Sequence, residues 1–203
     1  MSFRSREPLT VIEAVNWNRA AGSQRKTLIV LHCMQAPNKL TTAEWCGNYF
    51  AGRTRDKDGH LVPAPMASAN FAVDADSVVQ CVPAEMWAYH APGGKPSCNQ
   101  RGIGIEMPGY ASWERSQWLE PVLARPMLQR AARLCGELAA HFNIPIGFLD
   151  AEDLRAMLSG FTTHEQVSLA FRKTTHVDPG KGFPIREFLD WTRSYTSGAW
   201  AEV

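Results

Sequence analysis

The stretch KTLIVLHCM, residues 26–34, predicts the fold most directly. It is short, apolar and rich in β-branched residues, which favours a buried strand. A histidine at the end of such a strand, here His32, is by itself more often a packed core residue than a ligand. RGIGIEM, residues 101–107, predicts a second buried strand and carries Glu106 near its end. A carboxylate is costly to bury alone, so we expect Glu106 at a solvated strand end or as an active-site acid or base.

Further strands and helices are predicted on either side of these two strands. ANFAVDADSVVQCVP, residues 69–83, predicts two strands joined by a turn near Asp74. Thr41 and, three residues later, Glu44 form a capping-box pattern, which predicts a helix that ends at Gly52. Strands that alternate with helices favour an α/β layer structure over an all-β barrel.

Two more helices are predicted in the second half of the chain. Apolar residues recur at helical intervals after Pro126, and NIP ends that pattern at 143–145. Residues 183–195 predict a closing helix. The sequence shows no repeat and no low-complexity linker, so we expect one domain over residues 1–203.

Composition excludes several classes of protein. The 203 residues are 45% hydrophobic with a net charge of +1, which gives no electrostatic reason to expect nucleic acid or an anionic membrane as partner. No apolar stretch approaches the roughly 18 residues of a membrane span, so we expect no membrane insertion. The N-terminal segment lacks the apolar run of a signal peptide, so we expect synthesis into the cytoplasm. Five scattered cysteines without a CxxC pair predict free thiols rather than disulfides or a cysteine zinc site.

Histidines and an aspartate near the C-terminus suggest a metal site. His32, His164 and Asp178 together would leave a fourth zinc position open for water or substrate, as hydrolysis requires. Spacing alone does not show that they converge. His176 and Asp178 precede a Pro-Gly turn, so a simple capped turn is the alternative. WAYHAPGGKPSCN, residues 87–99, is either a surface loop or the aromatic lining of a groove for a sugar-peptide substrate.

Four motifs in this order resemble the type 2 zinc-dependent N-acetylmuramoyl-L-alanine amidases, which are related to peptidoglycan recognition proteins and phage amidase-type lysozymes. The motifs are LIVLHCM, SANFAVDADSVVQCVP, WAYHAPGGKPSCNQRGIGIEM, and THEQVS followed by DPGKGFP. The resemblance extends over roughly residues 26–190. It implies a peptidoglycan-recognition-protein-like fold with a central mixed β-sheet flanked by α-helices. It also implies Zn²⁺ as cofactor and peptidoglycan or a muropeptide as substrate.

The resemblance implies roles for individual residues. The zinc ligands would be His32, His164 and Asp178. Glu106 would be the catalytic acid–base, and His176 would stabilise the oxyanion where many relatives have lysine, with Lys173 as the alternative. Substrate-facing positions would be Trp87, His90 and Asn99. Cys33 would point to the opposite side of its strand from His32.

Two residues depart from the family pattern. Ala69 stands where some relatives carry a catalytic tyrosine, and Asn70 replaces a common histidine.

We expect a monomeric zinc hydrolase that cleaves between N-acetylmuramic acid and L-alanine. Of the possible biological settings, we favour a phage endolysin that is released to the wall by a holin. The alternatives are a cytoplasmic amidase that recycles anhydromuropeptides, a zinc hydrolase that cuts another bond, and a peptidoglycan-binding module without activity.

Overall fold

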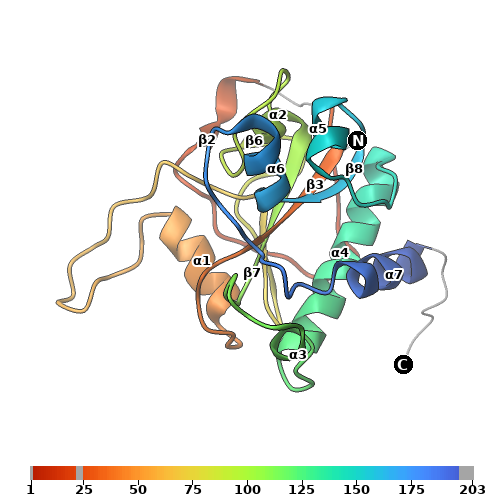
Figure 1. Ribbon diagram of the computed structural model, residues 1–203. Coiled ribbons are helices and arrows are strands. Elements are labelled where there is room, and N and C mark those ends of the chain that lie inside the picture. Colours follow the sequence, from red (N-terminus) through yellow and green to blue (C-terminus); the bar gives the residue numbers. More distant parts are fainter. Residues whose placement is uncertain (1, 22–24, 197–203) are drawn as a thin grey trace.

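The computed structural model describes residues 2–21 and 25–196 and is built around a six-stranded sheet (Figure 1). In spatial order the strands are β1 (Thr10–Val11), β5 (Val78–Gln80), β4 (Phe71–Val73), β7 (Gly102–Met107), β3 (Leu28–Cys33) and β8 (Gly160–Thr163). Only the β4–β5 pair is antiparallel, so the sheet is mixed. The short strands β2 (Trp17–Asn18) and β6 (Trp87–Ala88) pair separately. The predicted α/β class with a central mixed sheet is confirmed.

The helices lie between the strands and after the last strand along the chain. They are α1 (Thr42–Phe50), α2 (Cys98–Arg101), α3 (Arg115–Trp118), α4 (Ala124–Phe142), α5 (Ala151–Arg155), α6 (His164–Phe171) and α7 (Ile185–Thr196), after a 3-10 turn at Arg19–Ala21. The two helices predicted in the second half are α4 and α7. No helix in the described part of the chain combines the length and the apolar character needed to cross a bilayer.

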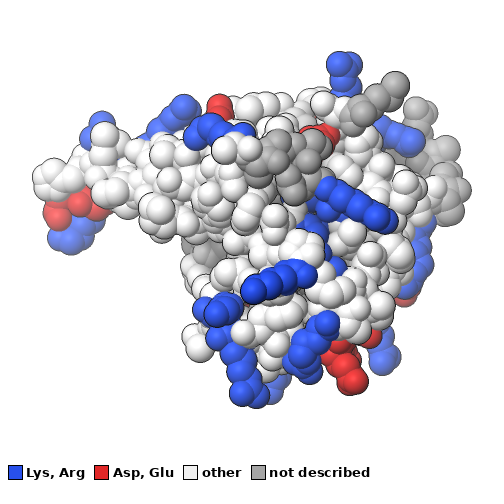
Figure 2. All heavy atoms as spheres, turned by 90° about the horizontal axis from the view of Figure 1, so that it is seen from above, with Lys and Arg blue, Asp and Glu red and all other residues white. Residues whose placement is uncertain are grey.

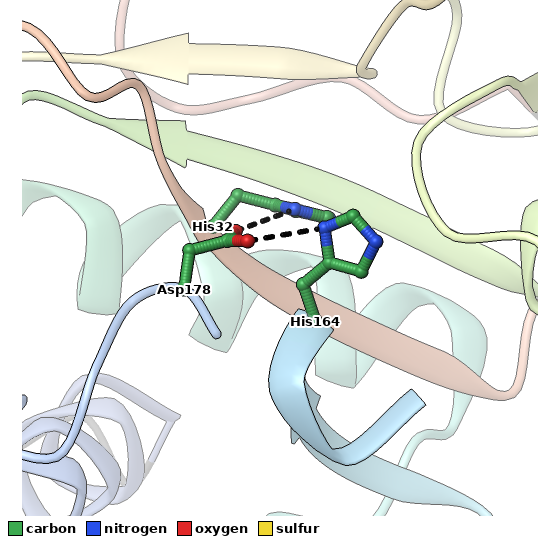
Figure 3. A group of neighbouring side chains, drawn as sticks. All are labelled: His32, His164 and Asp178. Atoms are coloured by element: carbon green, nitrogen blue, oxygen red, sulfur yellow. Dashed lines mark hydrogen bonds and ion pairs between the residues drawn. The ribbon is translucent and has the colours of Figure 1, made fainter. Parts of the chain in front are cut away.

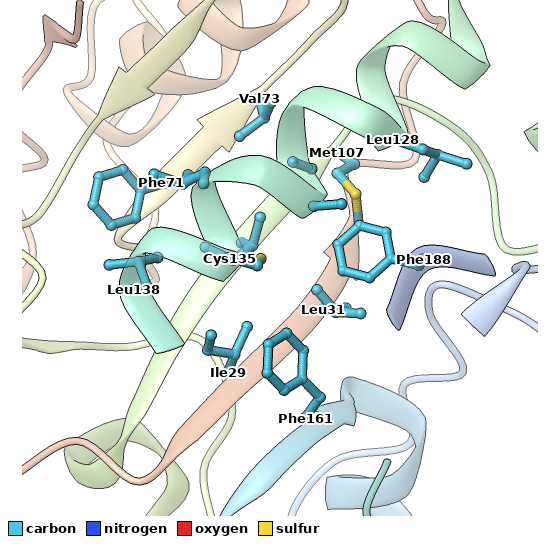
Figure 4. Packing of buried hydrophobic residues seen from close by; sticks show 14 of the residues in the cluster. Ile29, Leu31, Phe71, Val73, Met107, Leu128, Cys135, Leu138, Phe161 and Phe188 are labelled. Atoms are coloured by element: carbon cyan, nitrogen blue, oxygen red, sulfur yellow. The ribbon is translucent and has the colours of Figure 1, made fainter. Parts of the chain in front are cut away.

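Strand β3 lies between β7 and β8, and all six of its residues are buried. Such burial explains its continuous apolar run, because a central parallel strand is covered on both faces. Its odd-numbered residues pack with α4 and α7 in the main hydrophobic cluster, which includes Leu31, Cys135, Phe161 and Phe188 (Figure 4). Cys33 belongs to this cluster, on the face opposite His32, as predicted.

The other face of the sheet is covered by two separate groups of helices. Helix α1 packs Ala43, Cys46 and Phe50 against β4 and β5. Helices α2, α5 and α6 cover the even-numbered residues of β3, Leu28 and Val30. Beside these two groups the sheet is left open at the end where His32 and Glu106 lie, and a cavity forms there.

One predicted detail is wrong. Thr41 is the N-cap residue of α1, but its side chain makes no capping hydrogen bond, so the Thr41–Glu44 capping box does not form. The carboxylate of Asp74, in the β4–β5 turn, instead accepts the N–H of Ala43 at 2.9 Å. An acidic group from a distant turn therefore satisfies the helix N-terminus and interacts favourably with its dipole.

Residues 53–66, after α1, form an arm that stands out from the body of the protein (Figures 1 and 2). A bridge between Arg55 and Leu61 and a turn at Asp58-Gly59 hold the arm together, which confirms the predicted loop. All five cysteines are buried free thiols, also as predicted.

Candidate metal centre and active-site cavity

The site lies at the carboxyl ends of three neighbouring parallel strands, the edge at which open α/β sheets commonly bind ligands. His32 is the penultimate residue of β3 and lies opposite Glu106 of β7 in the sheet register. His164 directly follows β8 and is the first residue of α6. Thr163 caps this helix by accepting the N–H of Gln166, which fixes the point where the chain turns from strand to helix. Three strand ends thus bring His32, Glu106 and His164 together.

Asp178 reaches the site from the loop between α6 and α7. Its backbone carbonyl accepts the N–H of Glu165 at 3.0 Å, which ties the loop to the first turn of α6. Its carboxylate oxygens lie 3.2 Å from Nδ1 of His32 and 3.3 Å from Nδ1 of His164 (Figure 3). Burial opposes the charge of Asp178, but the hydrogen bonds with His164 and His32 outweigh it and hold its pKa well below the usual range. The aspartate is therefore an anion.

The three side chains fit a zinc ion. Zinc bonds of about 2.0–2.1 Å in a tetrahedron place neighbouring ligand atoms about 3.3 Å apart. In this structure Nδ1 of His32 lies 3.2 Å from one carboxylate oxygen of Asp178, and Nδ1 of His164 lies 3.3 Å from the other oxygen, which are separations of that order. One ligand atom from each of His32, His164 and Asp178 lies within 4.8 Å of the others, and all three residues are buried. A three-residue donor set leaves a fourth position, as catalytic zinc sites require.

The second nitrogen of each histidine faces another side chain. Nε2 of His32 lies 3.0 Å from Nδ1 of His90. Nε2 of His164 lies 3.5 Å from the hydroxyl of Thr174, which in turn bonds to Ser168 at 2.7 Å. Partners of this kind fix the orientation of metal-binding imidazoles. The arrangement therefore leaves both Nδ1 atoms directed at the carboxylate of Asp178.

Glu106 lies on the same side of the sheet as His32. Its Oε2 atom is buried and has no hydrogen-bond partner among the described residues. Burial, and then the negative charge of Asp178, raise the pKa of Glu106 to about 8. A carboxylic acid with so high a pKa in a cavity is typical of a group that takes up and releases protons during catalysis.

His32, Glu106, His164 and Asp178 line a cavity of about 620 Å³. Its remaining lining comes from the end of β3 and the residues after it, from α1, from the segments that precede β4 and β7, and from the Asp178 loop. These residues are Cys33, Met34, Gln35, Trp45, Cys46, Tyr49, Phe50, Ala67, Ser68, Tyr89, His90, Thr175, His176 and Val177. Trp45 and Tyr49, one turn apart on α1, stack with their rings nearly parallel and 5.7 Å between centroids. Trp45 is 48% exposed, so the cavity has an aromatic wall that a substrate can reach.

His176 lies at the mouth of the site. Its Nδ1 is 3.4 Å from Asp178, and its ring stacks on that of His164 at 4.1 Å between centroids. Burial and the neighbouring His164 lower its pKa, so the ring is neutral at pH 7 and can still donate one N–H. His176 lines the cavity, whereas Lys173, the alternative for its role, does not.

The three residues predicted to face the substrate, Trp87, His90 and Asn99, differ in whether they line the cavity. Asn99 directs its side-chain oxygen at the backbone, accepting the N–H groups of His90 at 2.9 Å and Ala91 at 2.6 Å. Trp87 lies in β6 with its ring against Tyr89. Of these residues, His90 and Tyr89 line the cavity, and Trp87 and Asn99 do not. Substrate binding by Trp87 and Asn99 therefore stays a prediction, and neither residue lines the cavity. The side chain of Asn99 is engaged by the two backbone N–H groups.

Sequence reasoning missed two features of the site. The only sequence signal for the aromatic wall was the spacing of Trp45 and Tyr49, four residues apart on a predicted helix. Buried core residues of a helix show the same spacing, so it does not identify a binding surface. The buried Lys26, just before β3, resembled an ordinary polar residue at a strand end. Two residues depart from the family pattern. Ala69 is buried and does not line the cavity. The side chain of Asn70 forms hydrogen bonds with the backbone of Gly104, Pro83 and Met86.

Solved structures share the fold. The AmpD derivative aligns with a TM-score of 0.63 and 18% identity over 90% of this chain and 93% of its own. An endolysin from Bacillus subtilis gives 0.55 and 20% over 95% and 99% of the two chains. Staphylococcus aureus hydrolase AmiA, solved with its ligand, gives 0.63 and 13% over 98% and 89%. No curated protein matches the chain in sequence.

The sequence itself carries the family assignment. Residues 22–181 match the family described as N-acetylmuramoyl-L-alanine amidase, and this range holds every residue that meets at the carboxyl ends of β3, β7 and β8. The match covers most of the chain, and the predicted resemblance is confirmed. The protein with this His-His-Asp site therefore belongs to the N-acetylmuramoyl-L-alanine amidase family.

Proposed function

We propose that the protein is a zinc hydrolase that cleaves the amide bond between N-acetylmuramic acid and the L-alanine of the stem peptide, and that it acts as a phage endolysin. The observation that carries this proposal is the convergence of His32, His164 and Asp178, which bring one ligand atom each within 4.8 Å of the others, beside Glu106 in one cavity. A peptidoglycan-binding module needs no such set, so the intact ligands favour catalysis.

The residues divide the chemistry between them. His32, His164 and Asp178 would hold Zn²⁺, which when bound lowers the pKa of water and polarises a carbonyl. Glu106 takes the proton of the attacking water as its oxygen adds to the amide carbon. His176 donates its N–H to the oxygen on which negative charge develops. The carbon–nitrogen bond then breaks, and Glu106 passes the proton to the leaving amine.

The cavity suits a substrate with a sugar on one side of the scissile bond. Pyranose rings present C–H groups that pack on aromatic faces, and the Trp45–Tyr49 wall offers such a face. The products are a free lactyl carboxylate on the muramic acid and a stem peptide with a free N-terminal L-alanine. In the proposed setting the enzyme is made in the cytoplasm, works as a monomer and reaches the wall after holin-type release.

The test is digestion of purified peptidoglycan by the purified protein, with zinc and with a chelator, followed by mass analysis of the products. Chelator-sensitive release of stem peptides that begin with L-alanine is the expected result. Cleavage of a different bond would contradict the assigned specificity. A variant with Asp178→Ala serves as the control without a complete ligand set.

The same assay separates the biological settings. An endolysin should attack the intact wall and lower the turbidity of wall suspensions. A recycling amidase should leave the intact wall unchanged and cleave small soluble anhydromuropeptides. Binding to the wall without cleavage of either substrate would identify a binding module and overturn the catalytic assignments.

A further inference from the structure

We infer that His90 is a positioning residue: it holds His32 in the tautomer and orientation that present Nδ1 to the metal. This inference rests on the proposed zinc function. It assigns His90 a role behind the metal centre, in place of the substrate contact predicted from the sequence.

The contact between the two rings defines the role. Nδ1 of His32 faces Asp178 at 3.2 Å, so this nitrogen is the one available to a metal shared with that carboxylate. The other nitrogen, Nε2, lies 3.0 Å from Nδ1 of His90, with the rings edge to face at 84°. When a metal is bound, its coordinating nitrogen carries no proton, so the proton of the neutral His32 ring would then sit on Nε2. His90 Nδ1 then accepts this N–H and fixes the tautomer.

Strand β7 is shaped to receive the His90 ring. A Cβ atom at Gly104 would lie 2.7 Å from Cγ and 2.9 Å from Nδ1 of His90, closer than side-chain carbons approach one another. At Gly102 a Cβ would meet the other end of the same ring at 3.2 Å. The two glycines of RGIGIEM therefore let the imidazole lie directly against the strand backbone, next to His32 on β3.

Two further side chains hold the segment that carries His90. Asn99 accepts the backbone N–H groups of His90 and Ala91. Lys26, which is 2% exposed, donates from Nζ to three backbone carbonyls. These carbonyls belong to Met86, Gln100 and Gly102, at 2.7, 3.0 and 2.9 Å. Bonds on both sides of His90 thus fix its backbone, and the ring has little freedom to leave His32.

The experiment measures zinc affinity with zinc alone, by competition between the zinc-free protein and a chromophoric chelator. His90→Phe fills the same space without an acceptor and should weaken zinc binding about 10–100-fold. His90→Asn places an amide oxygen near the position of Nδ1, so it should restore much of the affinity. His60→Phe, on the exposed arm, is the matched control and should bind zinc like the wild type. Urea unfolding of each zinc-free variant checks that the fold is retained.

The outcomes separate this inference from the proposed function. Tight zinc binding by the wild type and weak binding by His90→Phe, with rescue by His90→Asn, supports the positioning role. Equal losses in the Phe and Asn variants, or wild-type affinity in the Phe variant, would overturn it while leaving the zinc hydrolase intact. A wild-type protein that binds no zinc would overturn both.

Discussion

Replacing Glu106 with glutamine should abolish most of the activity and at the same time stabilise the zinc-free protein. Glu106 is half-buried near the anionic Asp178, and its Oε2 atom is buried without a hydrogen-bond partner among the described residues. An ionised carboxylate in this place is unfavourable, whereas the amide of glutamine has the same size and no charge. The substitution thus removes a carboxyl group that the proposed mechanism uses and whose ionised form opposes folding.

The size of the effect follows from the pKa of Glu106, which is raised from 4.5 to about 8. Between these values the unfolded chain is ionised at Glu106 while the folded chain keeps the proton. Folding stability is therefore fully present below pH 4.5 and falls as the pH rises towards 8, by about 1.4 kcal/mol for each pH unit. The sum is about 1 kcal/mol at pH 5 and about 3 kcal/mol at pH 7. Glu106→Gln avoids this loss because glutamine does not titrate.

Urea unfolding with a chelator present measures the difference directly. We expect Glu106→Gln to exceed the wild type by about 1 kcal/mol at pH 5 and about 3 kcal/mol at pH 7. The exposed Glu152→Gln on α5 is the control and should change stability by less than about 0.5 kcal/mol at either pH. A gain for Glu106→Gln that is absent at pH 7, or equal at both pH values, would refute the reasoning.

Activity and metal binding complete the comparison. Loss of a general base reduces turnover by about 10²–10⁴-fold, so kcat of Glu106→Gln should fall in that range while zinc remains bound. Near-wild-type kcat would exclude Glu106 as the base. Adding zinc should reduce the stability advantage of the variant, because a nearby cation favours the ionised form of the wild-type carboxylate.

Three further predictions test other parts of the site. Lys26→Met leaves three buried backbone carbonyls without their donor and should lower the free energy of unfolding by about 3 kcal/mol or more, measured by urea titration. Trp45→Ala removes the outer ring of the aromatic wall and should raise KM for a sugar-bearing muropeptide about fivefold, roughly 1 kcal/mol, with kcat unchanged in steady-state assays. His176→Ala should lower kcat by about 10²–10³-fold without changing zinc affinity, and His176→Lys should recover part of that loss.

The sequence predicts those parts of the fold that local pattern determines. β3 and β7 are continuous apolar runs because both are parallel strands buried on two faces, and such runs are recognisable without any knowledge of neighbours. The pairing of His32 with Glu106 is different, because register between strands 74 residues apart in the chain depends on the assembled sheet. The motifs of the family supplied the site residues; the residue pattern alone left their convergence open.

Contacts made across the fold explain what could not be predicted. Asp74 replaces the local capping box of α1 because the β4–β5 turn carries its carboxylate to the helix N-terminus. Asn99 has a polar side chain that could bind a substrate, but the orientation of this side chain is set by hydrogen bonds from the backbone N–H groups of His90 and Ala91. Lys26 is buried although lysine is usually exposed, and its burial depends on three backbone carbonyls that only the assembled fold brings together.

The charges of the cavity give a physical reason for a cation at this place. Asp178 is held as an anion by two histidines, and its charge is one cause of the raised pKa of Glu106, so the two carboxyl groups repel each other when both are ionised. Both groups line the same cavity, where a backbone bond ties Asp178 to α6 and Glu106 lies within β7. A divalent cation between His32, His164 and Asp178 would remove this repulsion and let Glu106 ionise. In the proposed mechanism, metal binding and the ionisation of Glu106 would therefore be coupled through one electrostatic interaction.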